Sequence, residues 1–175
     1  MQIIYLAGNS PHNKGWIEKV KKRFGGFSTG QILYYDHWKN ETGFVDFDRE
    51  AKKLAELVKN RDDYFVFAKS VGTILALKTT NEGVFSPKKA IFCGLAYRLA
   101  KKEGVLIDSI LVDLSVPTIF IQNEFDPVCG HQELERVLEK NKVKDCRLIK
   151  NSGNDTHDYE DYEQLAGLAK EFFVG

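Results

Sequence analysis

Three side chains at separate points of this 175-residue sequence could together carry out acyl transfer. Ser70 offers a hydroxyl nucleophile, and His157 offers an imidazole that can take the hydroxyl proton and return it to a leaving group. Asp126 offers a carboxylate that can fix the tautomer of the imidazole and stabilise its charged form. These residue types predict hydrolysis of a carboxylic acid derivative.

The surroundings of Ser70 suit a nucleophile. An apolar run, YFVFA, leads into KSVG and then into a second apolar run, which predicts a strand, a sharp turn and a helix. A serine on such a turn has strained backbone angles, so Ala68 and Gly72, two residues away on either side, have to be small. The turn also directs the amide of Val71 towards the reacting centre, where it can stabilise an oxyanion. Taken alone, the segment fits a plain helix cap as well.

The segment AKSVG resembles the nucleophile elbow GxSxG of the α/β-hydrolase family, with Ala68 in place of the first glycine. In that family the acid and then the histidine follow the serine along the chain. Here the run PTIFIQ is followed by a loop with Asp126, and CRLIK by a loop with His157. The resemblance covers nearly the whole chain except the family's first two strands. It implies a compact, nearly lidless serine esterase that needs no metal and no cofactor.

The resemblance also implies a second oxyanion donor in the loop after the first strand, AGNSPH. We expect this donor to be the amide of Asn9, with Ser10 as the alternative if the loop is shifted by one residue. The candidates for the substrate pocket all lie just past the end of a predicted strand; they are Ser10, His12, Trp38, Tyr97 and Phe125. The three aromatic residues among them fit ordinary packing equally well.

Other residues compete for the same roles. The alternative bases are His12, His37 and His131, and the alternative acids are Glu124, Asp108 and Asp113. Asp108 and Asp113 do not follow a strand in the expected place, and His131 is expected in the first turn of a helix. Asp155 and Asp158 flank His157, but neighbours in sequence seldom point at one another, so we interpret them as loop and helix-start residues.

The first loop departs from the phosphate-binding pattern GxxxxGK[ST]. The segment GNSPHNKG has Asn13 where the second glycine belongs and Gly15 where a magnesium-binding hydroxyl belongs. Pro11 also removes one backbone amide from the loop. The sequence therefore gives little support to nucleotide binding.

Alternating elements must position these residues. Six apolar runs predict buried parallel strands, at residues 3–7, 32–35, 64–68, 90–93, 118–121 and 147–149, and stretches with helical spacing separate most of them. The expected architecture is a three-layer α/β/α sandwich with a mainly parallel six-stranded sheet and a site at the carboxyl ends of the strands. The segment 95–116 is interpreted as a small lid or an irregular connection, and Gly30 as part of the turn before the second strand.

The length of the chain fits a single domain over residues 1–175. Lys plus Arg and Asp plus Glu both number 25, so no basic surplus points to nucleic acid. No run is long enough for a membrane span, no signal peptide is expected, and three widely spaced cysteines favour reduced thiols in the cytoplasm. The expected partner is a small-molecule acyl substrate. A rival class is a catalytically silent domain that binds a ligand or a protein in the same pocket.

Overall fold

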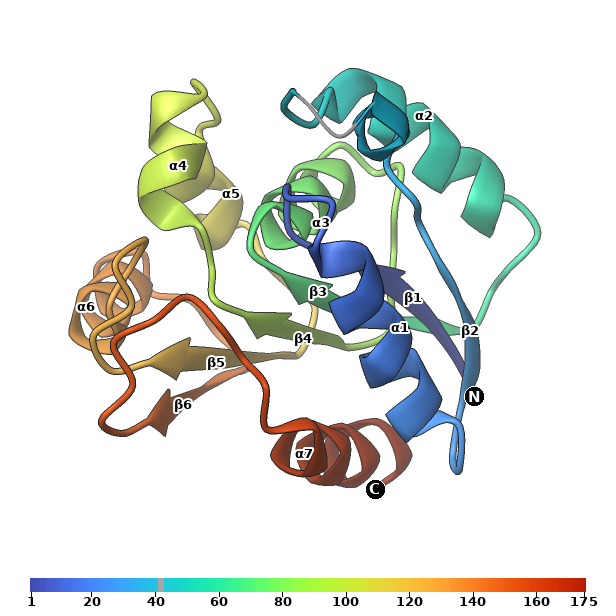
Figure 1. The fold of residues 1–175 in the computed structure, drawn as a ribbon. Helices are drawn as coiled ribbons and strands as arrows, with labels where there is room; N and C mark the ends of the chain where they lie inside the picture. The colour runs from blue at the N-terminus through green and yellow to red at the C-terminus, as the bar shows by residue number, and fades with distance from the viewer. Residues whose placement is uncertain (41–42) are drawn as a thin grey trace.

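A parallel sheet forms the centre of the molecule in the computed structural model, which describes residues 1–40 and 43–175. In these residues the sheet has six strands in the order β2-β1-β3-β4-β5-β6, and every neighbouring pair is parallel (Figure 1). The strands are β1 (Gln2–Leu6), β2 (Thr29–Ile32), β3 (Tyr64–Lys69), β4 (Ala90–Cys93), β5 (Thr118–Asn123) and β6 (Cys146–Asn151). The predicted α/β class and the parallel six-stranded sheet are confirmed.

Helices cover both faces of this sheet. They are α1 (Asn13–Phe24), α2 (Phe47–Val58), α3 (Val71–Asn81), α4 (Tyr97–Lys102), α5 (Ile107–Val112), α6 (His131–Lys140) and α7 (Tyr162–Val174), with a short 3-10 helix, η1 (Asp36–Asn40). The chain moves in one direction across the sheet from β1 to β2, and in the opposite direction from β2 through to β6. Right-handed crossovers therefore place α1 on one face and α2 to α6 on the other. The last helix, α7, packs beside α1 (Figure 1), which completes the three layers.

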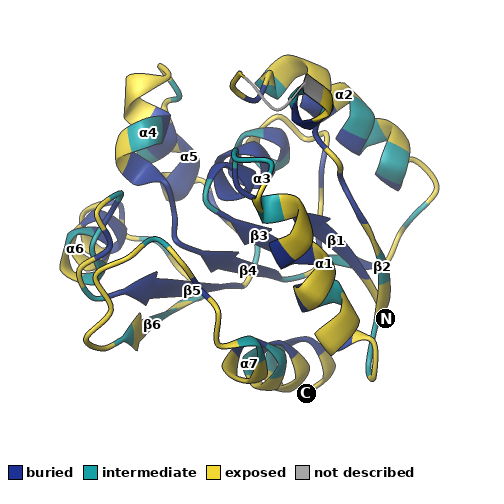
Figure 2. Cartoon of the chain, in the orientation of Figure 1, coloured by how far each residue is buried: buried dark blue, intermediate teal, exposed yellow. Residues whose placement is uncertain are grey.

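Burial explains why the central strands lack an alternating pattern. All residues of β4 and β5 are buried, because helices cover both faces of a parallel sheet. The edge strand β6 is only partly buried. Figure 2 shows the dark, buried strands at the centre and the exposed outer faces of the helices. No helix in the described part of the chain has both the length and the apolar character that crossing a bilayer requires.

The second strand differs from the prediction. β2 spans Thr29–Ile32 instead of residues 32–35, because its first three residues, TGQ, lie at the sheet edge and carry no apolar signal. Gly30 is part of this strand and not of the preceding turn. A side-chain carbon at Gly30 would collide with the carbonyl oxygen of Ile3 on β1. The apolar residues after Ile32 instead carry the chain towards η1.

Two short helices, α4 and α5, make up most of the segment 95–116. The Tyr97 hydroxyl donates to Asp108 at 3.0 Å, and Asn141 at the end of α6 donates to the same carboxylate oxygen at 3.0 Å. The loop between α4 and α5 presents Leu106, which is 77% exposed. An irregular connection therefore replaces a single crossover helix, and its role as a lid stays a prediction.

Candidate active site

Ser70 lies on the turn between β3 and α3, with φ 55° and ψ −123°. An L-residue is strained in this left-handed region. Backbone hydrogen bonds hold it there: the Ser70 amide donates to the carbonyl of Cys93 on β4 at 3.0 Å, and the Thr73 amide donates to the Ser70 carbonyl at 2.9 Å. The residue remains partly exposed at the carboxyl end of β3. These are the backbone angles and the position expected of a nucleophile on a sharp turn.

Gly72 brings the first turn of α3 against the end of β1. A side-chain carbon at position 72 would lie 2.7 Å from backbone atoms of Leu6 and Ala7. Contacts this short exclude any larger residue unless the backbone moves. Because the loop with Asn9 starts immediately after Ala7, this close approach brings the predicted second oxyanion donor to the same edge as Val71, the first residue of α3.

His157 and Asp126 form a direct pair, although 31 residues separate them in sequence. Nδ1 of His157 lies 2.7 Å from Oδ2 of Asp126. An ionised carboxylate only accepts hydrogen bonds, so Nδ1 carries the proton of this bond. Nε2 is buried and has no hydrogen-bond partner among the described residues. In the neutral ring this bond places the lone pair on Nε2, which is the arrangement that a general base needs.

The Asp126 carboxylate is buried, with its side chain fully covered. Burial by itself raises the pKa of Asp126, but hydrogen bonds from His157, the Val128 amide and the Tyr159 hydroxyl outweigh it, and the net pKa lies below the ordinary value. The other carboxylate oxygen accepts from the amides of Val128 at 2.8 Å and Cys129 at 3.4 Å. The acid therefore stays ionised at neutral pH.

The ring of His157 lies over the end of β4, beside the turn that carries Ser70. A side-chain carbon at Gly94 would be 2.8 Å from Cε1 of His157. Gly94 directly follows Cys93, whose carbonyl holds the Ser70 amide. Ser70 and His157 are therefore brought to neighbouring strand ends. No hydrogen bond joins the Ser70 hydroxyl to any described residue, and such contacts are often long until a substrate binds.

Asn123, the last residue of β5, holds the loop that carries His157. Its side-chain amide donates to the carbonyls of Thr156 at 2.9 Å and Asp158 at 2.8 Å, on either side of the histidine. Its side-chain oxygen accepts from Asn151 at the end of β6 at 3.0 Å. Asn123 is fully buried. No local pattern in the sequence marks this residue, because its role depends on contacts with the next strand.

The loop after β1 is held by aromatic side chains from the region of β2 and η1. The carbonyl of Asn9 lies 2.7 Å from Nε2 of His37 and accepts from Nε1 of Trp38 at 2.8 Å. The Tyr35 hydroxyl donates to the carbonyl of Ala7 at 2.9 Å. In the described residues, no acceptor is bonded to the Asn9 amide. Its assignment as an oxyanion donor stays a prediction, as does that of Val71.

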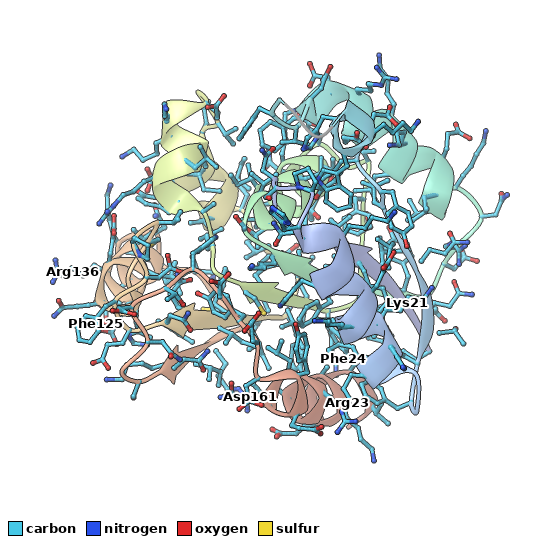
Figure 3. All side chains as sticks on the ribbon, viewed as in Figure 1. Lys21, Arg23, Phe24, Phe125, Arg136 and Asp161 are labelled. Carbon is cyan, nitrogen blue, oxygen red and sulfur yellow. The ribbon has the colours of Figure 1, made fainter. Side chains whose placement is uncertain are left out.

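The five predicted pocket residues are placed differently from one another. Trp38 and Tyr97 are buried, and both direct their polar atoms to other protein groups, Asn9 and Asp108. Ser10 is partly buried and His12 is exposed. Phe125 is 63% exposed and lies beside α6 on the outside of the molecule (Figure 3). Phe125 therefore departs from the expectation of an apolar pocket wall, since the turn after β5 points it outwards.

Two of the alternative acids have partners elsewhere. Glu124 accepts from the Gly153 amide at 2.9 Å, and Asp108 accepts from Tyr97. His131 begins α6, as predicted. No group of three or more His, Cys, Asp or Glu side chains within residues 1–40 and 43–175 is placed to hold a metal ion.

Lys69, the residue before Ser70, is buried, with 5% of its surface exposed. Its Nζ donates to Oδ1 of Asn13 at 3.2 Å, lies 4.9 Å from the centre of the Trp16 ring and is 3.7 Å from the Asp158 carboxylate. Burial lowers the pKa of Lys69, and the charge of Asp158 opposes this. The Lys69 side chain links the turn that carries Ser70 to the loop that carries His157. A lysine inside an apolar run was the only signal of this role in the sequence.

Comparison with known proteins gives matches in structure alone. No protein-family model matches the sequence, and neither does any curated protein. An uncharacterized protein from Bacillus cereus superposes with a TM-score of 0.73 and 19% identity, over 99% of this chain and 60% of that one. MGS-MChE2, an α/β-hydrolase enzyme from a lagoon-sediment metagenome in Morocco, has a TM-score of 0.69 and 16% identity, over 99% and 90%. Est1E from Butyrivibrio proteoclasticus, with ferulic acid bound, has a TM-score of 0.71 and 13% identity, over 99% and 88%.

These likenesses, together with the sheet order and the turn at Ser70, show that the chain has the α/β-hydrolase fold. The resemblance that AKSVG suggested is thus confirmed at the level of the fold. Its structural neighbours include esterases and other hydrolases. The chain spans 60% of the length of the Bacillus cereus protein.

Proposed function

We propose that the protein is a serine hydrolase that cleaves a small carboxylic ester, thioester or related acyl substrate through an acyl-enzyme. One observation carries the proposal. The strained Ser70 turn follows β3, and the buried pair of Asp126 and His157 follows β5 and β6, so all three residues stand at the carboxyl edge of one sheet. Nucleophile, base and orienting acid are thereby available at a single edge.

In the first half of the reaction, the Ser70 oxygen attacks the substrate carbonyl carbon and its proton passes to Nε2 of His157. Asp126 stabilises the imidazolium that forms. The oxyanion accepts hydrogen bonds from the amides of Val71 and Asn9. Nε2 then gives its proton to the leaving alcohol or thiol as the bond to the carbonyl carbon breaks, leaving the acyl group on Ser70.

In the second half, water attacks the acyl-enzyme and gives a proton to Nε2 of His157. The second tetrahedral species collapses, the acid leaves, and the proton returns to the Ser70 oxygen. The positive end of α3 favours both oxyanions, since Val71 is the first residue of this helix and its amide has no acceptor within the helix. The depressed pKa of Asp126 keeps the orienting charge in place throughout.

A fluorophosphonate probe tests the proposal directly. We expect stoichiometric labelling of the folded protein that disappears in Ser70→Ala. The matched control is Ser109→Ala on α5, where the hydroxyl only donates to the carbonyl of Leu106, and this variant should label like the wild type. Folded wild-type protein that takes up no label, or label that persists in Ser70→Ala, would contradict the proposal and favour a catalytically silent binding domain.

A substrate panel then separates the acyl classes. It contains p-nitrophenyl esters of increasing chain length, a thioester, an aminopeptidase substrate and methyl ferulate, the last because Est1E binds ferulic acid. We expect short acyl chains to be preferred, since α4 and α5 contain only six residues each and form a small connection next to the site. Every active substrate should lose its turnover in Ser70→Ala.

A further inference from the structure

Tyr159 is buried two residues after His157, with 2% of its surface exposed. Its hydroxyl donates to Oδ2 of Asp126 at 2.8 Å, the same oxygen that the His157 ring contacts at 2.7 Å. The hydroxyl in turn accepts from the amide of Asn123 at 3.1 Å. Because the amide supplies the proton of that bond, the hydroxyl proton is left for the carboxylate. Oδ2 of Asp126 therefore accepts hydrogen bonds from two donors.

The rest of Tyr159 is fixed as firmly as its hydroxyl. Its carbonyl accepts from Nε1 of Trp16 on α1 at 2.8 Å. Its ring lies across the end of β4, where a side-chain carbon at Gly94 would be 2.7 Å from Cε2. The ring stands perpendicular to that of His157, at 87° and 6.1 Å between centres. Contacts with the protein itself thus hold the hydroxyl on Asp126.

The hydroxyl is a permanent donor. Burial strongly raises the pKa of Tyr159, with the nearby Asp126 charge adding to the effect, so the phenol stays protonated throughout the working range of an esterase. Its hydrogen bond is one of those that lower the pKa of Asp126. Part of the negative charge that would otherwise act on His157 is thus taken up by Tyr159.

We propose that Tyr159 is a positioning residue that sets, through Asp126, the pH at which His157 becomes a base. The kinetic part of this inference rests on the proposed function. Without the hydroxyl, His157 is the only remaining donor to Oδ2 of Asp126, so more of the carboxylate charge stabilises the imidazolium and the imidazole releases its proton only at higher pH. The other titratable groups that face this site are Lys69 from β3, Cys93 from β4, Arg98 from α4, Cys129 from the acid loop, and Asp158 and Glu160 beside the histidine. A phenylalanine at position 159 leaves all of them in place.

The test is Tyr159→Phe, assayed as kcat/KM against pH with the best substrate of the panel. We expect the rise of kcat/KM on the acid side of this profile, the acid limb, to move to higher pH by about half a unit to one unit. The control is Tyr64→Phe, which removes another buried hydroxyl, one that accepts the Ser86 amide at 2.7 Å at the opposite end of β3. Tyr64→Phe should leave the limb unmoved. A limb in Tyr159→Phe that coincides with the wild-type limb would overturn the inference, even if the plateau rate fell.

A second measurement needs no turnover. Nuclear magnetic resonance follows the titration of the His157 ring in the Ser70→Ala protein, with tyrosine or phenylalanine at position 159. We expect a higher midpoint with phenylalanine, and an equal midpoint would contradict the role of Tyr159. If the midpoint shifts but the wild-type protein hydrolyses no substrate, this inference stands while the proposed function fails.

A fluorinated tyrosine at position 159 covers the case in which Tyr159→Phe does not fold. Fluorine makes the phenol more acidic and hence a stronger donor, without removing the ring. We expect the His157 midpoint to move to lower pH than in the wild type, opposite in sign to the effect of phenylalanine. A midpoint that stays in place or rises would also overturn the inference.

Discussion

The His157 ring contacts Asp126 at 2.7 Å because the two residues follow neighbouring strands of one sheet. β5 and β6 pair in register along their whole length, so their carboxyl ends, and the loops after them, meet at the same edge. Both oxygens of Asp126 have donors, two on each. The acid is consequently held in one orientation from several sides, and this leads to the first of four predictions.

Stability should depend on the charge of Asp126. Its pKa is below the ordinary value in the folded protein, so the ionised form contributes stability that is fully present above the pKa of the unfolded chain. This contribution is lost as the pH falls through the depressed value. We expect the free energy of unfolding of the wild type to exceed that of Asp126→Asn at pH 7, with the difference shrinking in acid. Urea denaturation between pH 2 and pH 7 measures it, and a difference that grows on acidification would show that the sign is wrong.

Replacing Ser70 by glycine should remove strain along with the nucleophile. Glycine adopts φ 55° without the steric cost that serine bears, a cost of about 1–3 kcal/mol. We expect Ser70→Gly to unfold a few degrees above the wild type and to take up no fluorophosphonate. Ser70→Ala is the matched control, since it also loses the hydroxyl but keeps the strain. Thermal unfolding compares them, and equal midpoints would count against strain at this turn.

Gly72→Ala should damage both stability and activity. The added carbon would lie 2.7 Å from backbone atoms of Leu6 and Ala7, so α3 and the end of β1 must separate, at a cost of about 1–3 kcal/mol. Gly15→Ala provides the contrast, because nothing lies within 4 Å of a side-chain carbon there and alanine favours the helix α1 by about 1 kcal/mol. Chemical denaturation of the two variants should give shifts of opposite sign. A neutral Gly72→Ala would refute the close approach.

Trp38→Phe should lower turnover more than substrate affinity. The indole N–H is one of two ring groups on the Asn9 carbonyl, and its loss leaves the proposed oxyanion donor less firmly oriented. Loss of a whole oxyanion donor lowers kcat by roughly 10²–10³, so a donor that is only less firmly oriented should lower kcat about 10-fold. Steady-state kinetics measure this, with Tyr34→Phe as a neighbouring aromatic control whose hydroxyl bonds to the exposed Glu18. A rise in KM at constant kcat would instead make Trp38 a substrate contact.

The α/β class could be predicted from the sequence, and so could the positions of Ser70, Asp126 and His157 in loops after strands, because each depends on a local pattern. An apolar run without alternation indicates a strand covered on both faces, and the residues after it lie at the carboxyl edge of the sheet. Small residues around a serine indicate a tight turn in the same way. Buried strands and tight turns are determined by residues that lie close together along the chain.

Only the tertiary structure decided which side chains meet. Tyr159 reaches Asp126 across 33 residues and Trp38 reaches Asn9 across 29, distances at which a sequence pattern carries no signal. The apolar pattern misplaces β2, because an edge strand has little apolar surface to bury. Phe125 faces outwards because the turn after β5 sets its direction. The sequence thus determined which residues stand at the edge of the sheet. The register of the strands and the packing of loops determined how they face one another, since hydrogen bonds between distant segments form only once those segments are packed together.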